Sequence, residues 1–282
     1  MRILVVGAAG QLGQAMVARL SREHVVTAAT RRDVDLTHHR ALLAFVLDHR
    51  PEAVINCAAF NDVDAAEDEQ ETALAVNGFA VRTLARATAE INAVLVHFST
   101  DFVFSGTGTT PYTEEDPPEP QSVYAQSKLL GEWVAADNPR HYVLRVESLF
   151  GGPHTRGSVD RIVDAIRTGQ QAPVFFDRVV SPSFVDDVAE ASEYVLRSVA
   201  PFGLYHCVNS GEATWLGVGR EIARLLDRPE TTLDPVSVRD VKLRASRPRY
   251  AALSNAKLAR AGYAMPSWQD ALQRHLNRRI AP

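Results

Sequence analysis

Short apolar runs alternate with longer segments of helical period through the first half of the chain. The apolar runs span residues 3–6, 25–29, 53–57, 94–99 and 142–146. They are nearly free of polar interruptions, as strands buried on both faces of a parallel sheet require. Segments of helical period span residues 12–21, 40–48, 69–91 and 123–136. This alternation predicts an α/β fold with a Rossmann-type, doubly wound parallel sheet.

The pattern is interrupted at two places along the chain. Between residues 106 and 120, four prolines exclude a regular helix and favour an ordered loop crossing toward a site, although a plain surface connection has the same composition. After residue 152 come a helix, an apolar run at 173–176, a helix near 184–198 and mixed elements. We predict a nucleotide-binding domain over residues 1–150, with a return near 174–200. Residues 151–282 would then form mainly a smaller substrate-binding lobe.

Composition and charge narrow the class of protein. The chain has 282 residues, 46% of them hydrophobic, which is ordinary for a globular protein. A net charge of -4 gives no bulk attraction to nucleic acid or to an anionic membrane, so we expect neither as a partner. Cys57 and Cys207 are too few for a disulfide framework. No signal-peptide pattern or stretch of roughly 18–20 apolar residues is present, and we expect a cytoplasmic protein.

A glycine-rich turn joins the first predicted strand to the first predicted helix. It reads Gly7-x-x-Gly10-x-x-Gly13. The first glycine permits a tight turn, the second lets a pyrophosphate approach the backbone, and the third lets the helix pack closely on the strand. The unpaired N–H groups of the helix start would bind the phosphates. A glycine-rich turn elsewhere is usually only a turn, but between a strand and a helix it predicts dinucleotide binding.

Two arginines follow the second predicted strand, in Thr30-Arg31-Arg32. An acidic residue at this place often binds the ribose 2′-hydroxyl of NAD, whereas a guanidinium matches a 2′-phosphate. We therefore favour NADPH and leave NADH open. The alternative is that both arginines are simply solvated. Asp35 and Leu36 are expected beside the adenine.

Tyr124 and Lys128 are four residues apart in a predicted helix and therefore lie on one face of it. A nearby ammonium would lower the pKa of the phenol, which suits a proton donor working near neutral pH. The spacing alone carries little weight. It gains meaning because it follows a dinucleotide turn and a Ser99-Thr100-Asp101 cluster.

These segments resemble the extended short-chain dehydrogenase/reductases, and within them the dTDP-4-dehydrorhamnose reductase family. The resemblance spans nearly the whole chain. It rests on segments 7–13, 56–64, 76–78, 99–104, 111–116, 124–132, 203–206, 212–215 and 247–253. The N-terminal segments are shared by many relatives, whereas Ser99-Thr-Asp-Phe-Val-Phe104 and Arg247-Pro248 narrow the resemblance to the rhamnose-type branch.

The resemblance implies NADPH-dependent reduction of the 4-keto group of a dTDP-6-deoxyhexulose. It also implies that the protein forms a homodimer. Tyr124 would protonate the ketone oxygen, Lys128 would bind the nicotinamide ribose, and Thr100 would bind the reacting carbonyl. The implied cofactor-binding residues are Gly7, Gly10, Gln11, Leu12, Gly13, Arg31, Arg32, Asp35, Leu36, Asn56, Ala58, Ala59, Asn77, Tyr124 and Lys128. The implied substrate-binding residues are Phe102, Val103, Phe104 and Arg247. Arg247, in a proline-fixed segment, could grip the substrate pyrophosphate or be an ordinary surface charge.

The sequence differs from the family's pattern in two segments that would bind the substrate. Ser148 stands where the family has a tryptophan, and residues 177–183 replace an Asp-Gln-x-Gly-x-Pro-Thr segment. The exact sugar nucleotide therefore stays open, as does another ketoreductase or an epimerase. A further alternative is a non-catalytic regulatory subunit related to the methionine adenosyltransferase β subunit. No motif demands a metal, because the short acidic pairs are typical of solvated or helix-capping residues.

Overall fold

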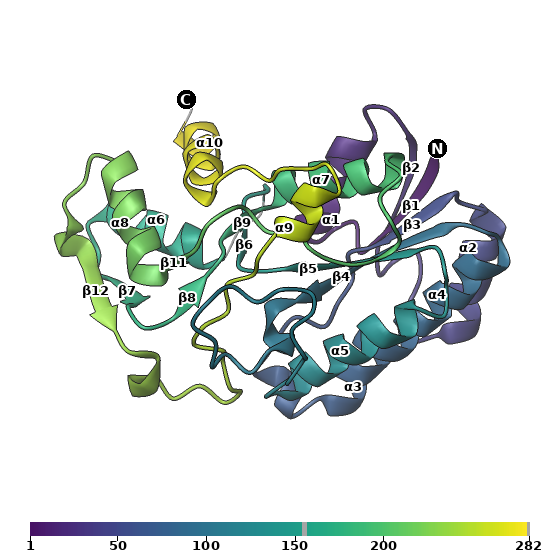
Figure 1. The fold of residues 1–282 in the computed structure, drawn as a ribbon, viewed down its shortest axis with the longest axis horizontal. Coiled ribbons are helices and arrows are strands. Elements are labelled where there is room, and N and C mark those ends of the chain that lie inside the picture. Colours follow the sequence, from purple (N-terminus) through teal and green to yellow (C-terminus); the bar gives the residue numbers. More distant parts are fainter. Residues whose placement is uncertain (154–156, 281–282) are drawn as a thin grey trace.

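The computed structural model describes residues 1–153 and 157–280, and its centre is a six-stranded sheet (Figure 1). The strand order is β10-β5-β4-β3-β1-β2, and each neighbouring pair is parallel. The strands are β1 (Arg2–Val6), β2 (Val25–Ala29), β3 (Ala53–Asn56), β4 (Val94–Thr100), β5 (His141–Val146) and β10 (Gly203–His206). The predicted doubly wound parallel sheet is confirmed.

Alternate residues of each strand face two different layers of helices. Ile3 and Val5 pack in a core with α1 and α7, whereas Leu4 and Val6 pack in a core with α2 and α4. Figure 1 shows α1 and α7 above the sheet, with α2, α4 and α5 below it. These helices are α1 (Gln11–Leu20), α2 (His39–His49), α4 (Ala80–Glu90), α5 (Val123–Ala135) and α7 (Val185–Arg197).

The single helix predicted over residues 69–91 is interrupted by a π-helical turn. The segment consists of α3 (Gln70–Leu74), the turn η2 (Ala75–Phe79) and α4. The turn directs the amide of Asn77 into the interior, where it has hydrogen-bond partners outside its own helix. A hydrophobic period cannot reveal such an insertion, because the flanking helices keep the same buried face.

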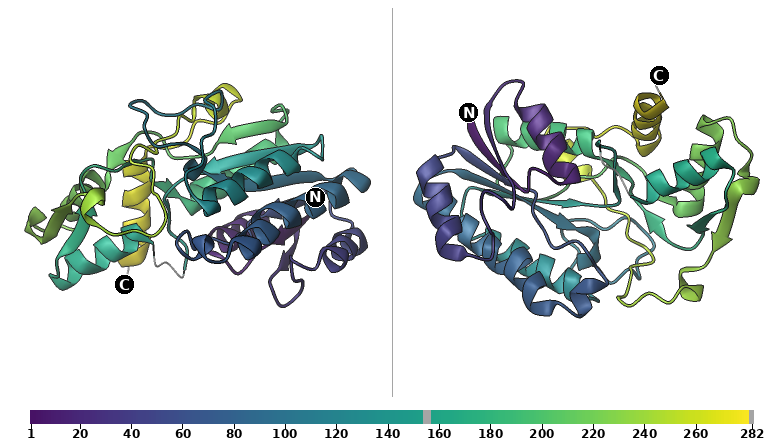
Figure 2. Two further views of the ribbon diagram at one scale, coloured as in Figure 1. Left: turned by 90° about the horizontal axis from the view of Figure 1, so that it is seen from below. Right: turned by 180° about the vertical axis from the view of Figure 1, so that it is seen from behind.

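The second half of the chain contributes both to the sheet and to a separate lobe. α7 packs beside α1, and β10 extends the sheet beyond β5. The lobe lies beyond the carboxyl edge of the sheet and is seen from two further sides in Figure 2. The remaining elements are η1 (Ala65–Glu67), η3 (Asp101–Val103), β6 (Leu149–Phe150), α6 (Ser158–Thr168), β7 (Ala172–Phe175), β8 (Val179–Val180), β9 (Ser183–Phe184), β11 (Ala213–Thr214), α8 (Trp215–Leu225), η4 (Glu230–Thr232), β12 (Leu233–Val236), η5 (Val238–Asp240), α9 (Ala256–Arg260) and α10 (Trp268–Ile280).

The proline-rich loop over residues 106–120 is tied to a distant segment of the chain. The N–H of Tyr112 donates to the carbonyl of Ala252 at 2.9 Å, and the Tyr112 ring stacks on Phe104. The loop thus contacts both Phe104, close to the end of β4, and the irregular segment around Ala252. Within residues 1–153 and 157–280, no helix combines the length and the apolar character needed to cross a bilayer.

Candidate active site

The carboxyl ends of the central strands border two adjoining cavities. Parallel pairing sets Val6 beside Ala29 and Asn56, and Thr100 beside Val146, so these ends share one edge. One cavity, of about 450 Å³, is lined by Arg31 and is called the Arg31 cavity. The other, of about 330 Å³, contains Tyr124 and is called the Tyr124 cavity. Their shared walls are Gly10, Cys57, Ala58, Ala59 and Asn61.

The glycine turn forms the floor between the two cavities. Gly7 has a φ of 78°, and a Cβ there would lie 2.6 Å from the nitrogen of Ala58. A Cβ on Gly13 would lie 2.2 Å from the carbonyl oxygen of Gly7, so Gly13 serves close helix packing and does not line either cavity. Gly10 begins α1 without a side-chain cap, which leaves the first N–H groups of α1 free to bind a phosphate. Gln11 and Leu12 line the Tyr124 cavity.

The two arginines after β2 differ in position. Arg31 lines the Arg31 cavity together with Asp35 and Leu36, and their binding of the cofactor stays a prediction. Arg32 lies outside both cavities, in a turn where its N–H donates to the Thr30 hydroxyl. Arg32 is exposed, and its predicted role in cofactor binding stays a prediction.

Thr100, Tyr124 and Lys128 line the same cavity. Tyr124 and Lys128 lie one turn apart on α5, whose start is capped by the Ser122 hydroxyl. The Tyr124 and Phe102 rings are nearly perpendicular, with 5.6 Å between ring centroids. A phenol, an ammonium and a hydroxyl around one cavity can donate a proton to a carbonyl oxygen and stabilise the charge on it.

The net pKa of Tyr124 is raised in this structure, whereas the sequence predicted that Lys128 would lower it. Burial and the neighbouring charge of Asp101 raise the Tyr124 pKa, against a hydrogen bond with Thr100. Burial also lowers the pKa of Lys128 to about 8. The Lys128 ammonium donates to the carbonyl oxygen of Phe98 at 2.5 Å, so its nearest hydrogen-bond partner is the end of β4. Tyr124 thus holds its proton at neutral pH.

Asn77 lies outside the two cavities, and its predicted contact with the cofactor stays a prediction. Its side chain is fully buried and lines neither cavity. The amide accepts from the N–H of Phe60 and donates to the Phe60 carbonyl and to the Ser127 hydroxyl. Asn56 does line the Tyr124 cavity, and its side-chain oxygen accepts from the N–H of Ala58. The two asparagines therefore shape the segment that carries Ala58 and Ala59.

The predicted substrate-binding residues separate into two groups. Phe102 lines the Tyr124 cavity, whereas the side chains of Val103 and Phe104 are buried in a core cluster and line neither cavity. Their role in substrate binding stays a prediction. Arg247 lies over the Phe102 ring at 5.8 Å and pairs with Asp64 at 2.8 Å. Its role toward a pyrophosphate stays a prediction.

Three charged residues that the sequence left unassigned gather at the substrate end. Asp101 and Glu147 are buried and line the Tyr124 cavity, and the charge of Arg178 acts on both. Burial raises the pKa of Asp101 to about 6 and raises that of Glu147 well above its usual range. The sequence signal was a glutamate directly after an apolar strand, beside the Ser148 departure, which indicates a strand end facing a site.

Glu147→Gln is expected to raise the thermal stability of the protein near neutral pH. The raised pKa keeps this carboxyl protonated in the folded state, whereas the unfolded chain ionises it from its ordinary value of 4.5 upward. The unfolded state therefore gains stability as the pH rises above that value, and glutamine removes the gain. We expect a melting temperature about 2–6 °C higher near neutral pH. The difference should shrink below about pH 4.5; an equal difference in acid would contradict this account.

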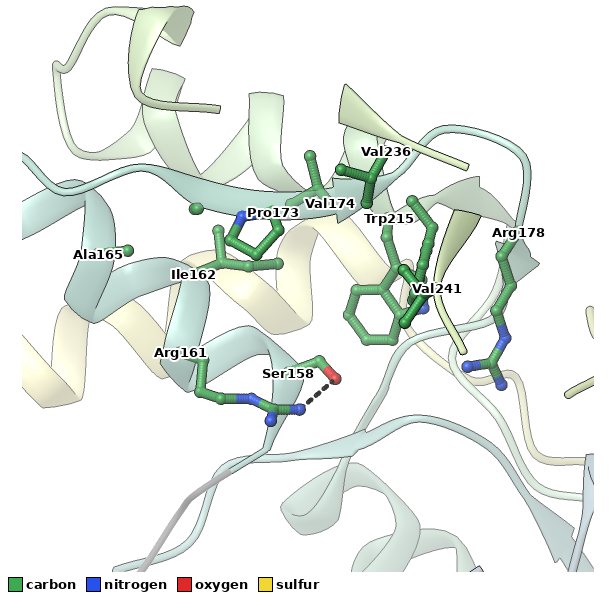
Figure 3. Close-up of a pocket in the computed structure, with 12 residues that line it drawn as sticks. Ser158, Arg161, Ile162, Ala165, Pro173, Val174, Arg178, Trp215, Val236 and Val241 are labelled. Carbon is green, nitrogen blue, oxygen red and sulfur yellow. Dashed lines mark hydrogen bonds between the residues drawn. The ribbon is translucent and has the colours of Figure 1, made fainter. Parts of the chain in front are cut away.

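A third, apolar cavity of about 400 Å³ lies in the lobe and reaches toward the same arginine (Figure 3). Trp215, Pro173 and Val241 form its walls, and Arg178 lies at one side. Arg178 also lies over the Phe102 ring at 5.6 Å, and Phe102 lines the Tyr124 cavity. Arg178 therefore stands between the Tyr124 cavity and this Trp215 cavity.

The acidic pairs are engaged as capping or ion-pairing groups. Asp187 binds Arg274 through two hydrogen bonds of 2.8 and 2.7 Å, and Asp186 pairs with Arg278. Asp116 accepts from the N–H of Thr113 at 2.7 Å. No group of three or more His, Cys, Asp or Glu side chains that could hold a metal ion occurs in the part of the chain that the structure describes.

Comparison with known proteins adds four findings. A family model for the RmlD substrate binding domain matches residues 1–280. A dTDP-4-dehydrorhamnose reductase of Streptomyces griseus is 35% identical, over 96% of this chain and 91% of that protein. A probable dTDP-4,6-dihydroxy-2-methyloxan-3-one 4-ketoreductase of Streptomyces antibioticus is also 35% identical, over 97% of this chain and 94% of that protein. The structure of a Bacillus anthracis dTDP-4-dehydrorhamnose reductase in complex with NADP has a TM-score of 0.92 and 28% identity, covering 98% of this chain and 99% of that one.

Proposed function

The chain belongs to the RmlD substrate-binding-domain family of extended short-chain dehydrogenase/reductases, and we propose that it is an NADPH-dependent reductase of nucleotide-sugar ketones. The proposed reaction reduces the 4-keto group of a dTDP-6-deoxyhexulose to dTDP-L-rhamnose or a close analogue. The observation that carries the proposal is the convergence of Thr100, Tyr124 and Lys128 on one cavity that adjoins the glycine turn.

The residues present fit a nicotinamide dinucleotide. The free N–H groups at the start of α1 suit its pyrophosphate, and Arg31 suits a 2′-phosphate beside Asp35 and Leu36. When bound, the cofactor supplies a hydride to the carbonyl carbon. Lys128 would bind its nicotinamide ribose.

In the proposed mechanism, Tyr124 gives its proton to the substrate oxygen. Its raised pKa keeps that proton in place until negative charge develops on the oxygen. The Thr100 hydroxyl, which donates to Asp101 Oδ1 in the free protein, would turn its proton to the same oxygen and orient the carbonyl. The Lys128 ammonium then stabilises the phenolate that remains on Tyr124.

Arg31→Ala is expected to raise the KM for NADPH by about 10–100-fold, because one charge-assisted hydrogen bond to the 2′-phosphate is lost. The KM for NADH should hardly change, since NADH lacks that phosphate. Arg32→Ala is the matched control, because Arg32 lies outside the cavity. Steady-state kinetics with both cofactors measures the change. Equal effects of the two substitutions on NADPH would contradict the role of Arg31.

The substrate class is supported by the way Arg178 stands between two cavities. The Tyr124 cavity would hold the keto sugar, and the apolar Trp215 cavity would hold the base of the nucleotide. Arg178 and Arg247, both over the Phe102 ring, would meet the pyrophosphate between them. A nucleotide sugar has this order of apolar, anionic and polar parts.

The test is an absorbance assay of NADPH with a dTDP-4-keto-6-deoxyhexulose, followed by product identification. Stoichiometric loss of NADPH with formation of a dTDP-6-deoxyhexose supports the proposal. Conversion without net loss of NADPH, with nicotinamide cofactor copurifying, would point to an epimerase or dehydratase. Absence of turnover on any nucleotide-sugar ketone, together with capture of a partner synthetase, would favour the regulatory subunit.

The division into a cofactor domain over residues 1–150 and a substrate lobe after it fits this function, and it is part of the proposal. So are a homodimer and a cytoplasmic location. Cys57 and Cys207 are free thiols, and burial raises the pKa of both, which suits a reducing compartment.

A further inference from the structure

Two acidic side chains, those of Asp101 and Glu147, line the Tyr124 cavity at the end where the substrate would bind. Asp101 is 3% exposed and Glu147 is 2% exposed, and both line the cavity. In each carboxyl group, one oxygen has a hydrogen-bond partner and the other, Asp101 Oδ2 or Glu147 Oε1, has none. An unpaired buried oxygen is costly, and both side chains belong to the cavity wall, so a ligand group bound there can complete the bonding.

The surrounding structure fixes both groups from behind. Asp101 Oδ1 accepts from the Thr100 hydroxyl at 3.0 Å, and Glu147 Oε2 accepts from the N–H of Ser181 at 2.7 Å. Ser148, the next residue along the chain, has a φ of 45°, a left-handed conformation that a serine rarely adopts. The chain thus bends sharply where Glu147 enters the cavity.

The charges favour a hydroxyl over an amine as the missing partner. The charge of Arg178 acts on both carboxyl groups, and burial raises the pKa of each, which favours a proton shared by the pair. One proton and one guanidinium balance the two acids. A protonated carboxyl and a carboxylate then offer one donor and one acceptor, the complement of an alcohol.

We propose that Glu147, beside Asp101, selects substrates that carry a hydroxyl on the ring carbon next to the reacting carbonyl. This inference rests on the proposed function. In the proposed substrate, C5 carries the ring oxygen and the methyl group, so the hydroxyl next to the C4 carbonyl is the one at C3. Glu147 therefore acts in specificity and takes no proton from the reacting atoms.

The test compares binding of dTDP-L-rhamnose and its 3-deoxy analogue by calorimetry, with NADP⁺ present. The natural protein should bind the hydroxylated compound about 10–100-fold more tightly, the usual effect of leaving buried polar groups unpaired. Glu147→Met, of similar volume, should remove most of this preference. Glu147→Gln, which keeps a donor and an acceptor, should retain most of it. Glu221→Ala, at a surface pair with Arg224, is the matched control and should behave as the natural protein.

Each result decides the matter. Equal binding of both compounds to the natural protein overturns the inference, even if Glu147→Met does not fold. Full preference in a folded Glu147→Met variant also overturns it and leaves the proposed function standing. Failure of the natural protein to bind either compound overturns the proposed substrate class and this inference together.

Discussion

Tyr124→Phe is expected to lower turnover by about 10²–10⁴-fold, the usual contribution of a positioned proton donor. The phenylalanine ring preserves the contact with Phe102 and removes only the hydroxyl. NADPH affinity should therefore hardly change. Turnover is measured from the loss of NADPH absorbance with a dTDP-4-keto-6-deoxyhexulose, and affinity by fluorescence titration of NADPH.

Tyr205→Phe provides the matched control for this substitution. Tyr205 is also buried, but its hydroxyl donates to the carbonyl of Pro201 at 2.7 Å, away from the Tyr124 cavity. The control variant should keep full turnover. If Tyr124→Phe also kept full turnover, the proton would have to come from another group, and the assignment of the acid would be wrong.

Lys128→Met is expected to lower kcat/KM by about 10²–10³-fold, because it removes both a ligand of the nicotinamide ribose and the cation beside the Tyr124 phenolate. The KM for NADPH should rise as well, which separates this variant from Tyr124→Phe. Methionine matches the length of the lysine stem, so the buried packing of α5 is largely kept.

The pH profile gives an independent readout of Lys128. Burial disfavours the ammonium and lowers its pKa to about 8, so the side chain loses its proton above that pH. kcat/KM of the natural protein should fall as the pH rises through about 8, and Lys128→Met should lack this limb. Lys257→Met, at a lysine over the Tyr205 ring, is the control and should keep it. An alkaline limb that persists in Lys128→Met would exclude Lys128 as its source.

The sequence predicted the elements and the local chemistry because both depend on short spacings. Buried strands of a parallel sheet are apolar on both faces, so β1 and β4 could be read directly from the chain. The same holds for the glycine turn, where the strand, the turn and the helix are consecutive. Tyr124 and Lys128 needed only a helical period to lie on one face.

Several side-chain placements could not be predicted from the sequence. Asn77 lies in a π-helical turn, and Val103 and Phe104 point into a core whose other members come from distant segments. Arg31 and Arg32 are neighbours, yet a turn directs only Arg31 into the cavity. In each case, a side chain's direction was decided by packing that no local pattern describes.

The sequence by itself determined the parallel sheet, the cofactor turn and the spacing of the phenol and the amine, since neighbours along the chain create all three. The tertiary structure alone decided that Asp101, Glu147 and Arg178 act on one another. These residues end or follow different elements, and they meet because parallel pairing aligns β4 with β5 while the lobe brings Arg178 back over Phe102. The proximity of these residues depends on the register between β4 and β5 and on the return of the chain at Arg178. Neither produces a periodic pattern in the sequence.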